Sequence, residues 1–503
     1  MQIKQRYMED RHIVAIDLGS YKVALTVARI NEDDIQVIYY KEARSAGIRN
    51  SYVFNSMQVT RPLKELVADA EKELNIKITQ AVVGMPKYRV RQETRQAQME
   101  LDPEECITHE DVNSLKADAL ENYPLDDPRS EEVFGAVAQS FSTGEEFQFV
   151  EDQIIGIPSE VLEGNFKVFI GKKSALHAID VAFNNLKIGI AKKYFTPDAV
   201  ARAVLNPSEM ENGVALIDFG GGVTSVSIYY GSIMRHYASI PFGGASITSD
   251  IRTECLISDS LAENIKLAFG ACMPDKLQNL SEKVIQINSG NASPNKQLPV
   301  KYLSEVITYR VKEIIEAILY EIEKSGFADN LRNGIVLTGG VANLANCANY
   351  IKEISGYNVR AGYPRHLFSA TGCDGVYETD AAVSIGLVLA AKTDRIRDCI
   401  LGENMVDIGG EVTFGNPSAG DAEKPQEEDT PDKGPGEDTG EAAAGQAGNG
   451  ELFGPGEIEE IEKPESHGHH GGKGKGTGKG PKEPIKPIRW LKTLFDEISN
   501  EKP

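Results

Sequence analysis

The stretch VALIDFGGGVTSVSIYY, residues 214–230, decides the fold of this chain. An apolar run of strand-forming residues leads into Asp218, which is followed by three glycines, Thr224 and a second strand with alternating apolar positions. This order predicts a β-hairpin that grips a phosphate, because glycines let backbone N–H groups approach an anion closely. A carboxylate at the end of the first strand can also hold a hydrated Mg²⁺ against the same phosphates. An ordinary glycine turn is the alternative for this stretch taken alone.

Two other stretches argue against that alternative. IVAIDLGSYKVALTV, residues 13–27, has the same plan with a shorter turn. Its polar and glycine positions are Asp17, Gly19, Ser20 and Lys22. GIVLTGGVANL, residues 334–344, is a strand that ends in two glycines and leads into a helix, whose N-terminus suits a ribose or an α-phosphate. The repeated strand–Asp–x–Gly plan predicts a duplicated domain with a nucleotide in the cleft between its halves.

In this order, the three stretches resemble the phosphate-1, phosphate-2 and adenosine motifs of the actin and sugar-kinase ATPase superfamily. Within it, the chain is most similar to the FtsA family of bacterial cell-division proteins. That narrower similarity is carried by GIVLTGGVANL, by MRHYASIPFGGASITSDI (residues 234–251), by AENIKLAFG (residues 262–270) and by the C-terminal segment. The resemblance covers about residues 12–400. It implies an α/β fold of the actin-like ATPase type, with two duplicated lobes flanking a nucleotide cleft, an inserted small α/β subdomain and a disordered C-terminal tail.

Alternating strand and helix signals, read with this resemblance, predict the domain boundaries. The first lobe comprises residues 12–85 and 164–205 and is closed by a helix within 380–400; an insert like the 1C subdomain of FtsA spans 86–163; the second lobe comprises 206–245 with 330–379, and 246–329. In the FtsA family the 1C insert contacts other division proteins and neighbouring subunits. The acidic character of this insert is more typical of a solvated face than of a site.

Composition excludes several classes of function. The net charge of −22 argues against a general nucleic-acid binder, since repulsion from phosphates would have to be overcome locally. Six scattered cysteines without a CxxC pair favour reduced thiols over a disulfide framework. The longest apolar run, around residues 381–391, is far shorter than the roughly 20 residues needed to span a bilayer. We therefore expect a soluble, cytoplasmic protein.

The resemblance implies a site for ATP and Mg²⁺. Asp17 and Asp218 form the expected catalytic pair and would hold the water shell of the magnesium ion. The residues expected to bind the phosphates are Gly19, Ser20, Lys22, Gly220, Gly221, Gly222 and Thr224, and those expected around the nucleoside are Glu263, Lys266, Gly339 and Gly340. Two plainer interpretations stay open: Lys22 as a solvated turn lysine, and Glu263 with Lys266 as a surface ion pair three residues apart.

The chain departs from the superfamily pattern at the residue that orients the attacking water. In filament-forming relatives such as MreB a glutamate stands before a proline, whereas this chain has Thr196 there and Asp198 two residues on. A threonine cannot act as a general base as a carboxylate can. The sequence therefore predicts nucleotide binding with slow or absent hydrolysis. Ser225 and Val341 also replace residues common in relatives, with more effect expected on affinity than on fold.

Composition changes after about residue 402. Residues 402–485 are acidic, then rich in glycine and lysine, and cannot bury enough apolar surface to fold. His467, His469 and His470 suit a spacer better than a metal site. Only ELFGPGEIEEIE, residues 451–462, has apolar character, and a short partner motif is possible there.

The chain ends in IKPIRWLKTLFDEISNEKP, residues 485–503, which predicts an amphipathic helix over 486–500. The expected membrane-facing residues are Ile488, Trp490, Leu491, Leu494, Phe495 and Ile498. A short helix with an apolar face, basic residues at its start and a flexible tether is typical of a membrane-surface anchor. Docking on a partner protein or on the core is the alternative.

The resemblance implies an ATP-binding cell-division protein that anchors the FtsZ ring to the membrane. It would bind the FtsZ C-terminal peptide and other division proteins, form filaments, and lie peripherally on the cytoplasmic face of the inner membrane at the division site. Two alternatives remain. One is a PilM-like cytoplasmic actin homologue of a pilus or secretion system. The other is a sugar or acid kinase, for which no motif for a catalytic carboxylate or a substrate pocket is found.

Overall fold

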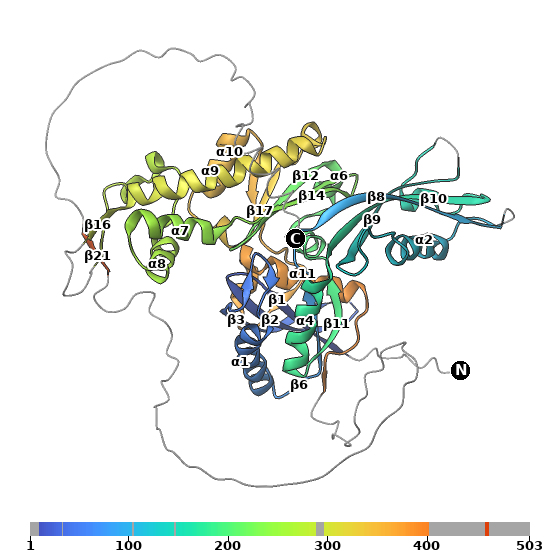
Figure 1. Ribbon diagram of the computed structural model, residues 1–503, viewed down its shortest axis with the longest axis horizontal. Coiled ribbons are helices and arrows are strands. Elements are labelled where there is room, and N and C mark those ends of the chain that lie inside the picture. Colours follow the sequence, from blue (N-terminus) through green and yellow to red (C-terminus); the bar gives the residue numbers. More distant parts are fainter. Residues whose placement is uncertain are drawn as a thin grey trace, which may run out of the picture.

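The computed structural model describes residues 10–32, 34–102, 105–144, 147–287, 296–401 and 458–461. These residues form two α/β lobes, each built on its own sheet, and a smaller insert that extends away from them (Figure 1). The predicted fold class is thereby confirmed for the described part of the chain. None of its helices combines the length and the apolar character that crossing a bilayer demands.

The first lobe is a six-stranded sheet in the order β11-β7-β1-β2-β3-β19. Its strands are β1 (Arg11–Leu18), β2 (Lys22–Ile30), β3 (Ile35–Arg44), β7 (Gln80–Gly84), β11 (Gly189–Tyr194) and β19 (Ser369–Ala370). Helices α1 (Ser56–Leu74) and α4 (Lys173–Leu186) pack together, as do α5 (Thr196–Val204) and α11 (Ala382–Thr393). Short strands β4 (Ile48–Arg49), β5 (Tyr52–Val53), β6 (Lys77–Ile78) and β20 (Ile400–Leu401) form two small ladders.

The second lobe repeats this plan with the order β14-β13-β12-β17-β18. Its strands are β12 (Val214–Phe219), β13 (Thr224–Tyr230), β14 (Ile233–Ile240), β17 (Ile335–Thr338) and β18 (Val359–Ala361). In both lobes three antiparallel strands are followed by a strand that pairs in parallel with the first of them, β7 on β1 and β17 on β12. This shared topology is the duplication that the repeated Asp–x–Gly turns predict.

Helices and short turns complete the second lobe. Its helices are α6 (Pro207–Asn212), α7 (Gly244–Cys255), α8 (Asp259–Phe269), α9 (Val300–Lys324) and α10 (Cys347–Ser355). Its 3-10 turns are η1 (Pro274–Lys276), η2 (Gln278–Leu280), η4 (Ala328–Asn330) and η5 (Gly340–Asn343), and η6 (Asp374–Tyr377) and η7 (Thr379–Ala381) precede α11. The apolar stripe of α9 is buried against the rest of this lobe.

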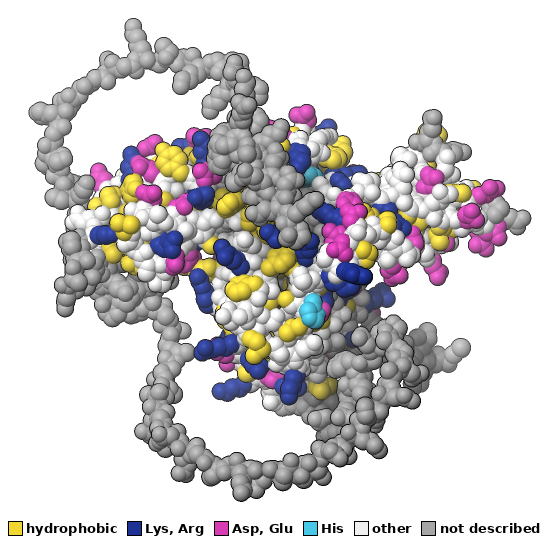
Figure 2. All heavy atoms as spheres, in the orientation of Figure 1, with side chains coloured by type: hydrophobic (Ala, Val, Ile, Leu, Met, Phe, Trp, Pro, Cys, Tyr) yellow, Lys and Arg dark blue, Asp and Glu magenta, His cyan; other side chains and the backbone are white. Residues whose placement is uncertain are grey.

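The insert is a three-stranded antiparallel sheet with its own apolar core. It contains β8 (Arg91–Glu100), α2 (His109–Glu121), β9 (Glu131–Ser142), α3 (Glu151–Ile154) and β10 (Val161–Lys172). β10 pairs with β8 and β9 beyond the boundary predicted at residue 163, because its whole length is needed to complete both ladders. Acidic side chains gather on the outer part of the insert (Figure 2).

The insert is joined to the second lobe through β14. Gln92 accepts a hydrogen bond from the Tyr237 N–H at 3.1 Å and lies 2.8 Å from Nδ1 of His236. Arg235 donates to the Gln139 carbonyl at 3.0 Å, and the Lys167 ammonium donates to the Arg235 carbonyl. The insert therefore contacts the lobe that is distant from it in sequence.

Most of the predicted tail lies outside the described residues. This holds for the anchor helix over 486–500, for the histidines at 467, 469 and 470, and for the linker over 402–485 except four residues. Those four form β21 (Ile458–Ile461), which pairs antiparallel with β15 (Val284–Ile287) on the side opposite β16 (Lys296–Pro299). Such pairing is available because an edge strand offers unpaired backbone groups to any extended segment within reach.

Candidate functional site

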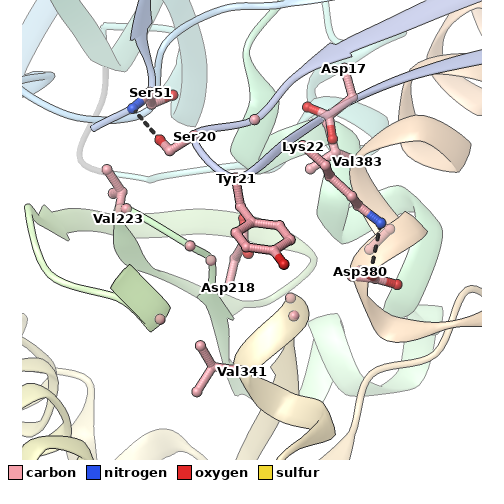
Figure 3. A pocket seen from close by; sticks show the side chains of 18 of the residues that line it. Asp17, Ser20, Tyr21, Lys22, Ser51, Asp218, Val223, Val341, Asp380 and Val383 are labelled. Atoms are coloured by element: carbon pink, nitrogen blue, oxygen red, sulfur yellow. Dashed lines mark hydrogen bonds and ion pairs between the residues drawn. The ribbon is translucent and has the colours of Figure 1, made fainter. Parts of the chain in front are cut away.

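A cavity of about 260 Å³ lies between the two lobes, where their acid–glycine turns meet (Figure 3). The turn between β1 and β2 lines one side, the turn between β12 and β13 and helix α8 line the other, and the β17–η5 turn closes the end. The predicted site residues that line it are Asp17, Gly19, Ser20, Lys22, Asp218, Gly220, Gly221, Gly222, Glu263, Lys266, Gly339 and Gly340. The structure therefore brings residues from four distant stretches to one cavity.

Glycine is required where the two turns face each other. A Cβ added to Gly222 would lie 2.8 Å from both the Cβ and the Oγ of Ser20, closer than real side chains pack. At Gly339, φ is +87° and a Cβ would lie 2.7 Å from an oxygen of Asp218, so that a side chain would be strained and would also clash. Both glycines thus let the backbone pack more closely at these positions than any side chain would permit.

The two predicted acids lie at the ends of equivalent strands, Asp17 on β1 and Asp218 on β12. Burial, with a smaller contribution from the nearby Asp218, raises the pKa of Asp17 to about 7 against the lowering effect of Lys22 and Lys87. The side chain of Asp218 is also mostly enclosed, with 10% of its surface exposed. Both acids thus face the cavity from opposite lobes.

Lys87 is a site residue that the sequence reading missed. Its ammonium is ion-paired with Oδ2 of Asp218, and it lines the same cavity. It follows β7, which runs parallel to β1, so that the loops after both strands emerge at the same edge of the sheet. A lysine just after the apolar run AVVGM, residues 81–85, was the available signal.

Lys22 is enclosed rather than solvated. Only 13% of its side chain is exposed, and its Nζ lies 2.6 Å from Oε1 of Glu42 and 2.7 Å from Oδ2 of Asp380. Burial lowers its pKa, but Asp380 and Glu42 outweigh that effect and raise the pKa above its ordinary value. The interpretation of Lys22 as a solvated turn lysine is therefore wrong.

Glu263 and Lys266 form a buried pair in the cavity wall rather than a surface ion pair. Lys266 Nζ lies 2.8 Å from Glu263 Oε2 and also donates to the Thr248 hydroxyl at 2.9 Å and the Gly244 carbonyl at 3.0 Å. Each of the two residues is 7% exposed. Burial lowers the pKa of Lys266, and its contact with Glu263 opposes that shift.

Tyr21 is a second residue that the sequence reading missed. Tyr21 lines the cavity, and Figure 3 shows its ring near the centre of the view. The Arg44 guanidinium carbon lies 4.0 Å from the centre of this ring, within the range of a cation–π contact. Burial raises the pKa of Tyr21, and so does its interaction with Glu263. The first phosphate turn thus reaches toward the second lobe.

Thr224 is the one predicted phosphate residue that does not line the cavity. Its side chain is fully buried, and its hydroxyl donates to the Phe242 carbonyl at 2.8 Å, which joins β13 to the turn before α7. Thr196 does line the cavity, but its hydroxyl is already used as a donor to the Met85 carbonyl at 2.6 Å. Asp198 pairs with Arg202 at 2.8 Å. Thr196 therefore supplies no carboxylate to the cavity at this position.

The donor chemistry of the cavity suits a magnesium ion bound through water. Mg²⁺ prefers oxygen ligands and keeps several waters, and Asp17 and Asp218 could accept hydrogen bonds from such waters. The described residues contain no group of three or more His, Cys, Asp or Glu side chains that is assembled for direct coordination. Lys87 stands beside one of the two acids, so that any ion there would share Asp218 with an ammonium.

Comparisons with known proteins agree with this geometry. The family model for the cell division protein FtsA matches residues 215–386. The FtsA of Neisseria meningitidis serogroup B is 28% identical over 386 residues, which are 76% of this chain and 91% of that protein. The FtsA of Bacillus subtilis is 24% identical over 395 residues, 78% of this chain and 86% of that protein.

Among solved structures, a chain of the PilM-PilN type IV pilus biogenesis complex has the same fold. It matches with a TM-score of 0.52 and 14% identity, covering 75% of this chain and 98% of that one. An identity this low bears on the fold alone, whereas the sequence matches above extend over most of both chains. The chain is thus similar to the cell division protein FtsA, over residues 215–386 by the family model and over about three quarters of its length by these two relatives.

Proposed function

We propose that this protein is a nucleotide-binding, actin-like component of the division apparatus that anchors the FtsZ ring to the cytoplasmic membrane. The observation that carries the nucleotide part is the meeting of two duplicated acid–glycine turns across one cavity. Each turn belongs to a different lobe. A ligand that contacts both turns favours the closed arrangement of the lobes, because it binds that state better.

ATP is the nucleotide that we propose. Ser20 and the glycines of the β12–β13 turn would hold the β- and γ-phosphates, and Lys22 would exchange one carboxylate partner for a phosphate oxygen. Glu263 and Lys266 would contact the adenosine from the wall of α8, beside the turn at Gly340. A magnesium ion, when bound, would neutralise phosphate charge near Asp17 and Asp218.

The proposed function includes slow or absent hydrolysis of ATP. A water attacking the γ-phosphate needs a base to accept its proton. The hydroxyl of Thr196 is not such a base, and it donates a hydrogen bond to the Met85 carbonyl. Bound ATP would therefore act by holding the lobes closed and favouring assembly of subunits on the membrane.

Equilibrium binding to the full chain tests the nucleotide part. Titration with a fluorescently labelled ATP should give saturable binding that unlabelled ATP displaces. An acceptor that becomes phosphorylated would instead favour the sugar-kinase alternative. A signal that unlabelled ATP does not displace at millimolar concentration would contradict the proposal.

Membrane anchoring by the C-terminal segment is the second part of the proposal, and it rests on the sequence pattern of residues 486–500. Trp490 is the only tryptophan of the chain, so its emission reports on this segment alone. Anionic vesicles should shift that emission to the blue and sediment the protein. A chain that ends at residue 480 should stay in the supernatant.

Paired substitutions sharpen the membrane test. Leu494→Glu places a charge on the apolar face and should abolish sedimentation, whereas Thr493→Glu places the same charge on the opposite face and should retain most of it. Equal loss in both variants would indicate a charge effect without insertion. Protein that never sediments with vesicles would contradict the anchor and favour recruitment by a partner, as in the PilM-like alternative.

A further inference from the structure

We infer that Lys87 supplies a built-in positive charge at the place where Asp218 would otherwise meet a divalent cation, so that this chain binds ATP with little dependence on magnesium. This inference rests on the proposed nucleotide function and concerns the same cavity. Its basis is the ion pair between Lys87 and Asp218 across the cleft.

The position of the ammonium is the first argument. Lys87 belongs to the first lobe and Asp218 to the second, and 12% and 10% of their side chains are exposed. A Cβ built on Gly220 would lie only 3.2 Å from Nζ of Lys87, which places the charge directly beside the second phosphate turn. The charge of Lys87 also reaches Asp17, where it opposes the rise in pKa caused by burial. The Lys87 ammonium thus interacts electrostatically with both carboxylates.

The backbone of Lys87 is held in place on both sides. Its N–H donates to Oγ of Ser51 at 3.1 Å, and its carbonyl accepts a hydrogen bond from the hydroxyl of Tyr237 on β14. The side chain therefore starts from a fixed point between the lobes. A lysine on a loose surface loop would lose more side-chain entropy on binding a phosphate.

The remaining donors of Lys87 distinguish it from the other lysines of the cavity. Lys22 is shared by two carboxylates, and Lys266 is used by Glu263, Thr248 and Gly244. Among the described residues, Lys87 makes one ion pair, and an ammonium has three N–H donors. Phosphate oxygens beside Gly220 could accept the others without breaking the contact with Asp218.

A divalent cation would meet a different situation. To approach Asp218, the cation must either displace the Lys87 ammonium or lie next to it. Two neighbouring positive charges repel each other in a partly enclosed site. The lysine therefore lowers the advantage of the metal while it provides part of the same charge. The dissociation constants for ATP measured without and with magnesium are therefore expected to be similar.

The experiment measures that ratio directly. Labelled ATP is titrated into the full chain in excess Mg²⁺ and, separately, in EDTA. The natural chain should bind with dissociation constants that agree within about threefold, a difference below 1 kcal/mol. Lys87→Gln should lose about tenfold or more in EDTA, the size expected for a charge-assisted hydrogen bond, and much less in Mg²⁺. Lys64→Gln, on the exposed face of α1, is the matched control and should behave as the natural chain.

Lys87→Arg separates charge from folding. It keeps the positive charge and should restore binding in EDTA, which a purely structural defect of Lys87→Gln would not explain. Binding of the natural chain only in Mg²⁺, or equal affinities of the natural chain and Lys87→Gln in EDTA, would overturn the inference while leaving the nucleotide function intact. Absence of binding in both buffers would contradict the nucleotide function itself.

Discussion

Gly222 and Ser20 lie against each other across the cleft, and a single methyl group on Gly222 would come within 2.8 Å of the Ser20 side chain. The two residues are 202 positions apart and belong to the corresponding turns of the two duplicated lobes. Their contact means that the corresponding turns of the two lobes pack against each other at the site. It also makes the closed cleft sensitive to any added volume there.

Gly222→Val should therefore weaken ATP binding by at least about tenfold, because the side chain keeps the turns apart and fills space next to the phosphates. Titration with labelled ATP measures this loss. Gly189→Ala is the matched control, since a Cβ there meets only ordinary contacts, 3.5 Å from Gln80 and Thr79. Full affinity in Gly222→Val would show that the turns do not bind the ligand.

The pH dependence of stability should reveal the buried Asp17. Its pKa is about 7 in the folded protein and 3.8 in its ordinary state, so the folded form holds a proton more tightly. The contribution of Asp17 to the free energy of unfolding is then greatest at low pH, and it falls as the pH rises from about 4 to about 7. Asp17→Asn removes this penalty, and in the nucleotide-free protein it should raise the thermal unfolding temperature more at pH 8 than at pH 5. The same increase at both pH values would contradict the assignment.

ATP hydrolysis should stay at the background rate even with saturating ATP and Mg²⁺. The physical reason is that Thr196 offers no base and Asp198 is engaged by Arg202. Release of inorganic phosphate over hours measures it, with a reaction without protein as the reference. Phosphate release well above that reference, and sensitive to Thr196→Val, would show that another group activates the water.

The crossing of α5 and α11 should tolerate no added methyl group. A Cβ on Gly386 would lie 2.1 Å from the Ala199 carbonyl oxygen, which is too close for any rearrangement of side chains alone to relieve. Gly386→Ala should cost about 1–3 kcal/mol of unfolding free energy as the helices move apart. Denaturant unfolding measures the change, with Ser384→Ala on the same helix as a control for substitution itself. An unchanged midpoint would show that the crossing adjusts freely.

The cavity shows which features of the site could be predicted from the sequence and which could not. The strands and turns around Asp17, Asp218 and Gly339 could be predicted, because apolar runs that end in acids and glycines are local signals. Whether Lys22 and Lys266 are buried or exposed could not be predicted in the same way. Each had a surface interpretation, and only packing against the opposite wall showed that both are enclosed.

The partners that span the lobes needed the tertiary structure. Lys87 and Asp218 are separated by 131 residues, and Tyr21 and Arg44 lie within one lobe while the tyrosine reaches the wall of the other. The pairing of β21 with β15 likewise joins segments that share no local pattern. The sequence by itself determined the duplicated fold and its two phosphate turns, since these follow from short-range periodicity and backbone freedom. The closure of the lobes decided which charges meet in the cleft, because ion pairs and burial depend on distances that no local pattern encodes.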